Sequence, residues 1–261
     1  MITFTDLQEG VYDLNIFKAF FLAGGPGSGK SYVVQRTTGG LGMKVINSDD
    51  IFEKMLDDEL GTQDLRDIDP TVRDEIRGRA KALTKKKKDN FLEGRLGLII
   101  DGTGKDYDKI SGQKSKLDNL GYDTYMIFVN TSLDTALERN QMRPRKLKDS
   151  MVTLLWNQVQ QNIGKFNILF KPSNFIIVDN NDAREDLMPP IIKIVRRFAK
   201  KKVTNHIAKG WIKMELAKKE RGESGTIGTG RVTSTRKQTI DPEKLDKIQK
   251  GGFVKFARKT R

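Results

Sequence analysis

Five short apolar runs alternate with polar segments of helical character along the chain. The runs span residues 18–23, 44–47, 96–100, 124–129 and 174–178. A near-continuous apolar run is typical of a strand buried on both faces, and strands that alternate with helices form parallel sheets. The pattern therefore predicts an α/β fold, a three-layer, doubly wound parallel sheet of about five strands.

The polar segments between these runs carry helix signals. We expect helices over residues 31–36, 51–60, 70–93 and 106–120, among others. Asp69 and Pro70 have the form of an N-cap followed by a first-turn proline. Lys85 to Lys88 lie in the long helix that follows, and we interpret them as a solvated helix face rather than a dedicated binding patch.

The first apolar run leads directly into a glycine-rich loop with the spacing G-x-x-x-x-G-K-[ST]. Small residues allow successive backbone N–H groups to surround a polyphosphate, and a helix that begins at the loop's end adds its positive dipole end. Lys30 is predicted to reach the β- and γ-phosphates, and the Ser31 hydroxyl to hold Mg²⁺. The predicted nucleotide-binding residues of the loop are Gly24, Gly25, Pro26, Gly27, Ser28, Gly29, Lys30 and Ser31.

Polar residues follow the second and third apolar runs, at the sheet edge where ligands bind in such folds. Asp49 and Asp50 follow the second run, and Asp101 ends the third. Phosphoryl transfer to a hydroxyl requires a metal, a group that takes the acceptor's proton, and cations that offset the developing charge.

We expect Asp49 to be the base and Asp50 to cap the next helix; the alternative is that Asp49 is itself the cap. Asp101 is expected to hold Mg²⁺ or its waters, and the alternative is an ordinary aspartate that opens a loop. Gly102 and Gly104 fit a backbone that passes close to the substrate.

Three arginines lie within seven residues: Arg139, Arg143 and Arg145. They are candidates to close over the nucleotide and to stabilise the charge of the transition state. The alternative is that they offset the negative end of their helix. Three arginines so close together exceed what that role requires, which favours a functional role.

These motifs together resemble a known kinase family. The loop at 24–31 and the stretches 46–50, 100–103 and 139–143 look like the 5′-kinase domain of phage polynucleotide kinase, and they are similar to the zeta-toxin kinases. The resemblance covers residues 18–180, approximately. It implies a P-loop kinase fold, a catalytic base that matches Asp49, and arginines matching Arg139 and Arg143 that clamp ATP.

The chain departs from these families at two points. They tend to carry an arginine three residues after the base that contacts the acceptor's phosphate, whereas this chain has Phe52, with Lys54 as a possible replacement. Polynucleotide kinase often carries a phosphatase motif, D-x-D-G-T. The Asp-Gly-Thr at 101–103 follows Ile99 and Ile100, so the phosphatase nucleophile is missing.

The chain is basic, and its positive charge is concentrated near the end. The net charge is +14, and residues 221–261 contain 11 Lys or Arg and 4 Asp or Glu. Basic charge indicates a polyanionic partner without specifying it. We expect a P-loop kinase domain over residues 1–204, an amphipathic helix over 205–220 that docks through Ile207, Trp211 and Met214, and a flexible basic tail over 221–261.

The absence of cysteine excludes disulfides and thiolate metal sites, and it is typical of a reducing cytoplasm. The first residues lack the apolar core of a secretory signal, and no window approaches the length of a membrane span. We therefore expect a cytoplasmic protein that does not contact a membrane, and the sequence leaves the oligomeric state open.

The sequence thus predicts an ATP- and Mg²⁺-dependent kinase that phosphorylates a hydroxyl of a nucleic acid or a nucleotide. Two alternatives stay open: a zeta-toxin-like kinase acting on a nucleotide sugar, and a non-kinase ATP-binding protein associated with nucleic acid. The predicted catalytic residues are Asp49, Lys30, Arg139 and Arg143, the predicted metal ligands are Ser31 and Asp101, and the further nucleotide contact is Arg145.

Overall fold

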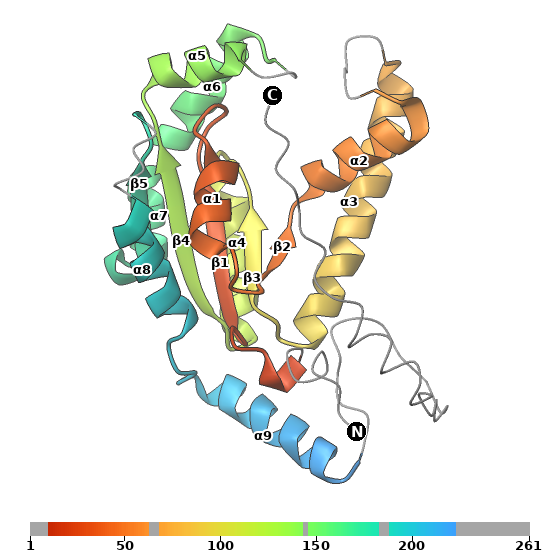
Figure 1. Ribbon diagram of the computed structural model, residues 1–261, viewed down its shortest axis with the longest axis vertical. Helices are drawn as coiled ribbons and strands as arrows, with labels where there is room; N and C mark the ends of the chain where they lie inside the picture. The colour runs from red at the N-terminus through yellow and green to blue at the C-terminus, as the bar shows by residue number, and fades with distance from the viewer. Residues whose placement is uncertain (1–9, 63–67, 143–145, 183–187, 223–261) are drawn as a thin grey trace, which may run out of the picture. The chain divides into compact units, whose positions relative to one another are not determined.

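The five apolar runs form one parallel sheet with helices on both faces (Figure 1). The computed structural model describes residues 10–62, 68–142, 146–182 and 188–222. The strands lie in the order β2-β3-β1-β4-β5, and every neighbouring pair is parallel. Their bounds are β1 Lys18–Ala23, β2 Lys44–Ile46, β3 Leu98–Asp101, β4 Asp123–Asn130 and β5 Phe175–Asp179. The predicted doubly wound parallel sheet of five strands is confirmed.

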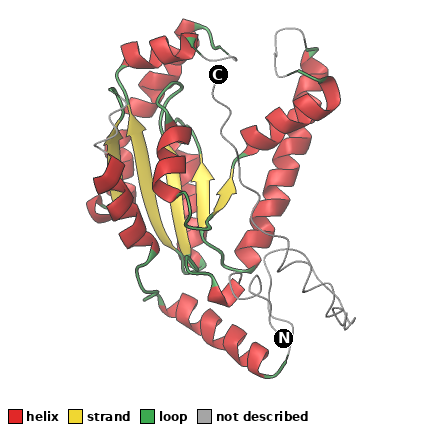
Figure 2. Ribbon diagram, viewed as in Figure 1, coloured by secondary structure: helices red, strands yellow, loops and turns green. Residues whose placement is uncertain are grey.

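Helices connect successive strands and cover the sheet (Figure 2). The described helices are α1 Lys30–Thr38, α2 Ser48–Leu60, α3 Pro70–Glu93, α4 Tyr107–Asn119, α5 Leu133–Gln141, α6 Asp149–Gln160, α7 Ile163–Phe170, α8 Met188–Ala199 and α9 His206–Glu220. Short 3₁₀ turns cover Gly10–Tyr12 (η1) and Pro172–Asn174 (η2). Among the described residues, none of these helices is both long and apolar enough to pass through a bilayer.

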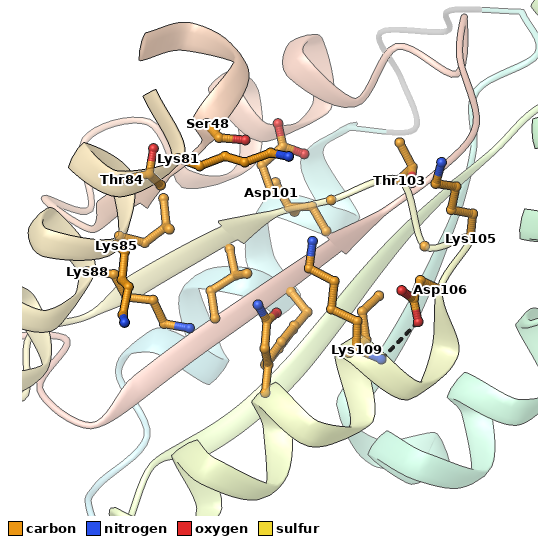
Figure 3. Close-up of a pocket in the computed structure, with 18 residues that line it drawn as sticks. Ser48, Lys81, Thr84, Lys85, Lys88, Asp101, Thr103, Lys105, Asp106 and Lys109 are labelled. Carbon is orange, nitrogen blue, oxygen red and sulfur yellow. Dashed lines mark hydrogen bonds between the residues drawn. The ribbon is translucent and has the colours of Figure 1, made fainter. Parts of the chain in front are cut away.

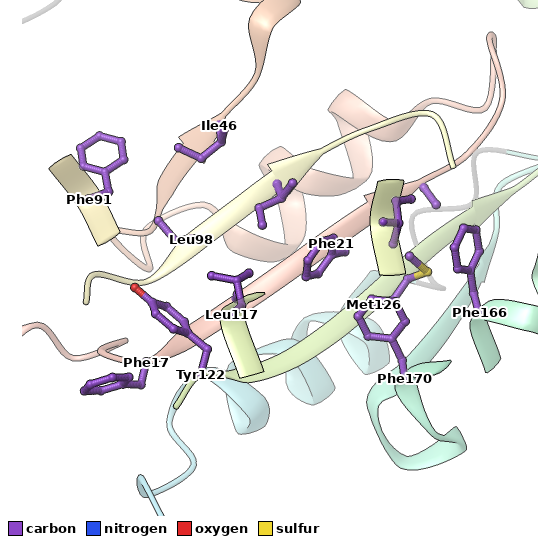
Figure 4. Close-up of a cluster of buried hydrophobic side chains, with 14 of the residues drawn as sticks. Phe17, Phe21, Ile46, Phe91, Leu98, Leu117, Tyr122, Met126, Phe166 and Phe170 are labelled. Atoms are coloured by element: carbon purple, nitrogen blue, oxygen red, sulfur yellow. The ribbon is translucent and has the colours of Figure 1, made fainter. Parts of the chain in front are cut away.

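The alternation of side chains along β1 divides the core into two layers. Phe21 faces the layer that holds Phe166 and Phe170 of α7 (Figure 4). Phe20 faces the opposite layer, which contains Val33 of α1. Because β1 is central and all six of its residues are buried, the loop that follows β1 is anchored on both sides.

Helix caps explain where α2 and α3 begin. The Asp69 side chain accepts hydrogen bonds from Thr71 N at 2.8 Å and Val72 N at 3.3 Å, so the predicted cap of α3 is confirmed. For α2 the prediction is wrong. The cap is Asn47, whose Oδ1 accepts from Asp49 N at 2.9 Å. An asparagine at the end of β2 satisfies the free N–H groups, so neither aspartate is needed for that role.

Helices α2 and α3 pack on each other outside the edge strand β2 (Figure 1). A small apolar cluster joins them, made of Phe52, Leu56, Ile76 and Ala80. This hairpin therefore has a small core of its own, separate from the two core layers that pack on the sheet.

The last described helix, α9, contacts the start of the sheet through one of the three predicted residues, Trp211. Ala208 is fully buried, and Trp211 packs edge-on against Phe17 with the ring centroids 5.5 Å apart. Ile207 and Met214 are exposed. The predicted tail, residues 221–261, lies almost entirely outside the described residues.

Candidate functional site

The glycine-rich loop connects the end of β1 to the start of α1, at the carboxyl edge of the sheet. Gly24 N donates to Thr103 O at 3.0 Å, which ties the loop to the end of β3. Lys30 Nζ donates to Gly24 O at 2.7 Å, so the ammonium group lies across the loop. The first turn of α1 offers backbone N–H groups and a positive dipole end at the same place.

Two glycines of the loop are required by its geometry. Gly27 has a φ of +77°, and a Cβ there would lie 2.5 Å from Ala136 O. Gly29 has a φ of +78°, and a Cβ there would lie 2.3 Å from Asn180 Nδ2. Both positions combine a left-handed backbone with close contact, so any side chain would displace the loop.

Asn180 holds the loop from the opposite side of β1. It follows β5, it is buried, and its Nδ2 donates to Ser28 O at 2.8 Å. Its own N–H donates to Asn130 O at 2.9 Å, at the end of β4. Sequence analysis missed this residue. The signal was its place directly after the last apolar run, at the edge where the other candidates lie.

Arg139 lies against the same loop. Its Nη2 donates to Asn181 O at 2.9 Å, and its Nη1 would lie 3.8 Å from a Cβ on Gly29. The Nη1 atom is buried without a hydrogen-bond partner, as is Ser28 Oγ. Two unsatisfied polar groups beside a phosphate-binding loop are groups that phosphate oxygens would satisfy. The other two predicted arginines, Arg143 and Arg145, lie outside the described residues.

Asp101 ends β3 next to the loop. Its Oδ2 accepts a hydrogen bond from Asn47 Nδ2 at 3.2 Å, while its Oδ1 is buried and has no partner. Burial raises the pKa of Asp101 above its ordinary value; Lys30 partly offsets this, and Asp50 and Asp49 raise it further. An ionised Asp101 is therefore costly in the free protein, and a bound cation would offset that cost.

Asp50 lies close to this carboxylate. Its Oδ1 accepts from Asn47 Nδ2 at 2.7 Å, so one amide bridges Asp50 and Asp101. Burial, followed by the charge of Asp49, raises the pKa of Asp50, and Lys87 lowers it. Ser31, Asp50 and Asp101 line one cavity of about 400 Å³ between α1 and the β2 edge of the sheet.

These residues fit Mg²⁺. The ion is usually held by one or two carboxylates, a hydroxyl, waters and the oxygens of the nucleotide, not by an all-protein cage. Among the described residues, no group of three or more His, Cys, Asp or Glu side chains is arranged to hold a metal ion. The partnerless Oδ1 of Asp101 and the Ser31 hydroxyl are the atoms that would hold it, with Asp50 beside them.

Asp49, the predicted base, lies apart from this cavity. Its Oδ1 is 3.1 Å from Nη2 of Arg77 on α3, and its side chain is 52% exposed. The guanidinium of Arg77 also stacks over Phe52, 4.9 Å from the ring centroid. Arg77 therefore orients the Asp49 carboxylate toward α3. A charge-assisted hydrogen bond of this kind fixes the carboxylate's direction more than it stabilises the fold.

A second cavity, of about 370 Å³, opens between α3 and α4 (Figure 3). The described residues that line it include five lysines: Lys81, Lys85 and Lys88 from α3, Lys105 from the β3–α4 loop and Lys109 from α4. Lys85, Lys86 and Lys87 are exposed and Lys88 is half-buried, in agreement with the expected solvated helix face, but Lys85 and Lys88 also line this cavity. The signal in the sequence was the i, i+4, i+7 spacing of the three α3 lysines, which places them on one face.

Gly104 allows the loop after β3 to pack closely against the end of β1. It has a φ of +82°, and a Cβ there would lie 2.7 Å from the Ala23 Cβ at the end of β1. Asn162 Nδ2 donates at 3.0 Å to both Gly104 O and Lys105 O, which fixes the loop after β3. Gly102 meets only ordinary van der Waals contact. Close packing against β1 is therefore enough to explain the glycine at 104.

Comparison with known proteins agrees with this architecture. A model of the AAA domain family matches residues 20–165. No curated protein matches the chain in sequence. Among solved structures, the complex of AvrRxo1-ORF1 and AvrRxo1-ORF2 with sulphate ions has a TM-score of 0.50 at 13% identity, over 89% of this chain and 70% of that one.

Two kinase structures match less closely. A Chloroflexus aurantiacus protein assigned as a kinase has a TM-score of 0.48 and 16% identity, over 69% of this chain and 97% of that one. A gluconokinase from Sinorhizobium meliloti has a TM-score of 0.44 and 16% identity, over 71% of this chain and 95% of that one. At such identities a likeness concerns the fold alone.

Proposed function

We propose that this chain, which belongs to the AAA domain family and has the P-loop kinase fold, is an ATP-dependent phosphotransferase that acts on a hydroxyl of a nucleic acid or nucleotide. One observation carries the proposal. The phosphate-binding loop, the buried and unpartnered Nη1 atom of Arg139 and the buried and unpartnered Oδ1 atom of Asp101 lie at one edge of the sheet.

The donor side of the site consists of residues that would hold ATP. Backbone N–H groups of the glycine-rich loop and the first turn of α1, together with the Lys30 ammonium, would bind the phosphates, and Arg139 Nη1 would reach them from α5. Ser31 and Asp101 would hold Mg²⁺, which offsets phosphate charge when it is bound. Arg143 and Arg145 are proposed to extend the arginine contact over the nucleotide.

The acceptor side begins at Asp49. In the proposed reaction, the oxygen of the acceptor hydroxyl forms a bond to the γ-phosphorus while the bond from that phosphorus to the ADP oxygen breaks. The hydroxyl proton passes to Asp49, which Arg77 holds in place on the side of α3. Asp50 is the competing candidate, because it lies nearer to Asp101 and lines the cavity of Ser31.

A matched pair of variants separates the two aspartates. Asp49→Asn and Asp50→Asn each remove one charge from the same helical turn and keep the shape. With γ-labelled ATP and a panel of 5′-hydroxyl oligonucleotides, nucleosides, nucleotides and nucleotide sugars, we expect Asp49→Asn to lower transfer about 100-fold or more while leaving ATP binding unchanged. A larger loss in Asp50→Asn would move the base to that residue. If no member of the panel is labelled, the kinase proposal fails.

A further inference from the structure

The lysine-lined cavity has no role in the reaction as described so far. It lies between α3 and α4, and it shares Asp101 with the cavity that holds Ser31 (Figure 3). A molecule bound there would therefore lie beside the carboxylate proposed to hold the metal. This position beside the proposed metal site suits the molecule whose hydroxyl receives the phosphoryl group.

The lysines on α3 form a stripe that continues from the predicted base. Arg77, which binds Asp49, is followed on the same helical face by Lys81, Lys85 and Lys88. Lys86 and Lys87 lie on the same helix but do not line the cavity. The stripe thus joins the candidate base to a basic cavity by way of a single helix.

The positive charge of this cavity is little offset by the protein. Among the described residues, none of the five lysine ammonium groups forms an ion pair. Two carboxylates line the cavity, and one of them, Asp106, is the N-cap of α4 and accepts from Lys109 N at 3.0 Å. Burial lowers the pKa of Lys88, and the charges of Lys116 and Lys109 lower it further against the opposing effect of Asp89.

We propose that this cavity is the acceptor subsite and binds a compact hydroxyl compound that carries at least one phosphate group. The role of the cavity as acceptor subsite rests on the proposed function, whereas the binding of a phosphorylated compound does not. Lysine ammonium groups bind phosphate as point charges, and five of them line this cavity. The described residues that line it include no arginine, so a phosphate here would be held by ammonium groups and not by a bidentate guanidinium.

The size and the walls of the cavity favour a small molecule over a strand of nucleic acid. Its volume of about 370 Å³ is near the lower end for ligand sites. Sequence-tolerant binding of single strands relies on aromatic side chains on which bases stack. Among the described residues that line the cavity, the one aromatic side chain is Phe21 of β1, which is only 1% exposed and offers no surface for stacking.

The test uses binding alone, so it does not depend on catalysis. The full-length protein, saturated with Mg²⁺ and the non-hydrolysable analogue adenylyl imidodiphosphate, is titrated calorimetrically with two pairs of probes: uridine and uridine 5′-monophosphate, and ribose and ribose 5-phosphate. A 5′-hydroxyl oligothymidylate is titrated in addition to the two pairs. The variants are Lys85→Ala and Lys88→Ala, and Lys86→Ala is the matched control, with thermal melts to show that all three fold.

The phosphorylated member of at least one pair should bind about tenfold more tightly than its partner, because a hydrogen bond to a charged group is worth that much. Lys85→Ala and Lys88→Ala should each reduce this preference about fivefold or more, and Lys86→Ala should leave it within about twofold. Equal binding within both pairs, an equal loss in Lys86→Ala, or tight binding of the oligothymidylate alone would overturn the proposal. If transfer is absent while this lysine-dependent binding is present, only the proposed function fails.

Discussion

At the scale of the residue, Asp101 destabilises the folded chain but is placed to bind a cation. The residue is half-buried, and its buried Oδ1 atom makes no hydrogen bond. Unsatisfied buried acceptors are costly, and native structures retain few of them. A cation at this position would satisfy the oxygen and offset the charge. The residue is therefore better explained by a ligand than by the fold.

Substitution of Asp101 by asparagine tests this conflict. Burial, as the largest effect, raises the pKa of Asp101 above 3.8 in the folded chain, so protonation favours the folded state. That stabilisation is fully present below the unfolded pKa and is lost as the pH rises through the folded pKa. In Asp101→Asn the neutral side chain should raise the melting temperature at pH 7 by a few degrees, about 2–4 °C per kcal/mol, and the gain should disappear at acid pH.

The same variant should lose function as it gains stability. We expect Mg²⁺-dependent phosphotransfer to fall about 100-fold, as when a group that stabilises transition-state charge is removed. Wild-type activity should itself decline on acidification at a higher pH than an ordinary aspartate would require, because burial raises the pKa of Asp101 and this residue must be ionised to hold Mg²⁺. A melting temperature at pH 7 that is lower than in the wild type, together with unchanged transfer, would contradict this account.

At the scale of the element, the α2–α3 hairpin carries the contacts that orient Asp49. Arg77→Ala removes the ion pair with Asp49 and the stacking on Phe52. The ion pair is largely exposed, whereas the stacking covers the buried ring of Phe52, so the free energy of unfolding should fall by about 1–2 kcal/mol. The value of kcat should fall about tenfold through misplacement of the base. Arg73→Ala is the control, because Arg73 pairs with Asp74 on the same helix. Equal kinetic losses in the two variants would show that Arg77 has no special role.

The sequence predicts an element correctly where a single local pattern, such as a continuous apolar run or a helix cap, is enough to define it. The run 18–23 is buried along its whole length and was found at its bounds, and Asp69 was identified as a cap because its side chain bonds only local N–H groups. Contacts between distant segments were not predictable. Asn180 binds Ser28 across 152 positions of the chain; its place after the last apolar run puts it at the right edge of the sheet but does not identify its partner.

The lysines of α3 show a third case. Lys85 and Lys88 follow the helical period, but Lys86 and Lys87 interrupt it, so the charge run is also consistent with a solvated face. Only the position of α4 opposite α3 shows which of the four face a cavity. The docking face of α9 is predicted in part: Trp211 packs on the core, but Ala208 is the buried neighbour, and Ile207 and Met214 are exposed.

At the scale of the whole molecule, the order of the strands brings the site together. Because β1 lies between β3 and β4, the loop after it contacts the ends of both neighbours: Gly24 bonds Thr103 O beyond β3, and Asn180 links Ser28 to Asn130 of β4. Parallel strands place all these ends at one edge. The central claim is that this edge binds the phosphates of ATP through Lys30.

Calorimetric titration with ATP and Mg²⁺ tests that claim most directly, with the wild type, Lys30→Ala, and Lys193→Ala on the exposed side of α8 as the control for loss of one charge. The account predicts that the wild type and Lys193→Ala bind ATP equally well, and that Lys30→Ala binds about 10- to 100-fold more weakly, the value of a charge-assisted contact to phosphate. Unchanged affinity in Lys30→Ala, or no binding of ATP by the wild type, would contradict it.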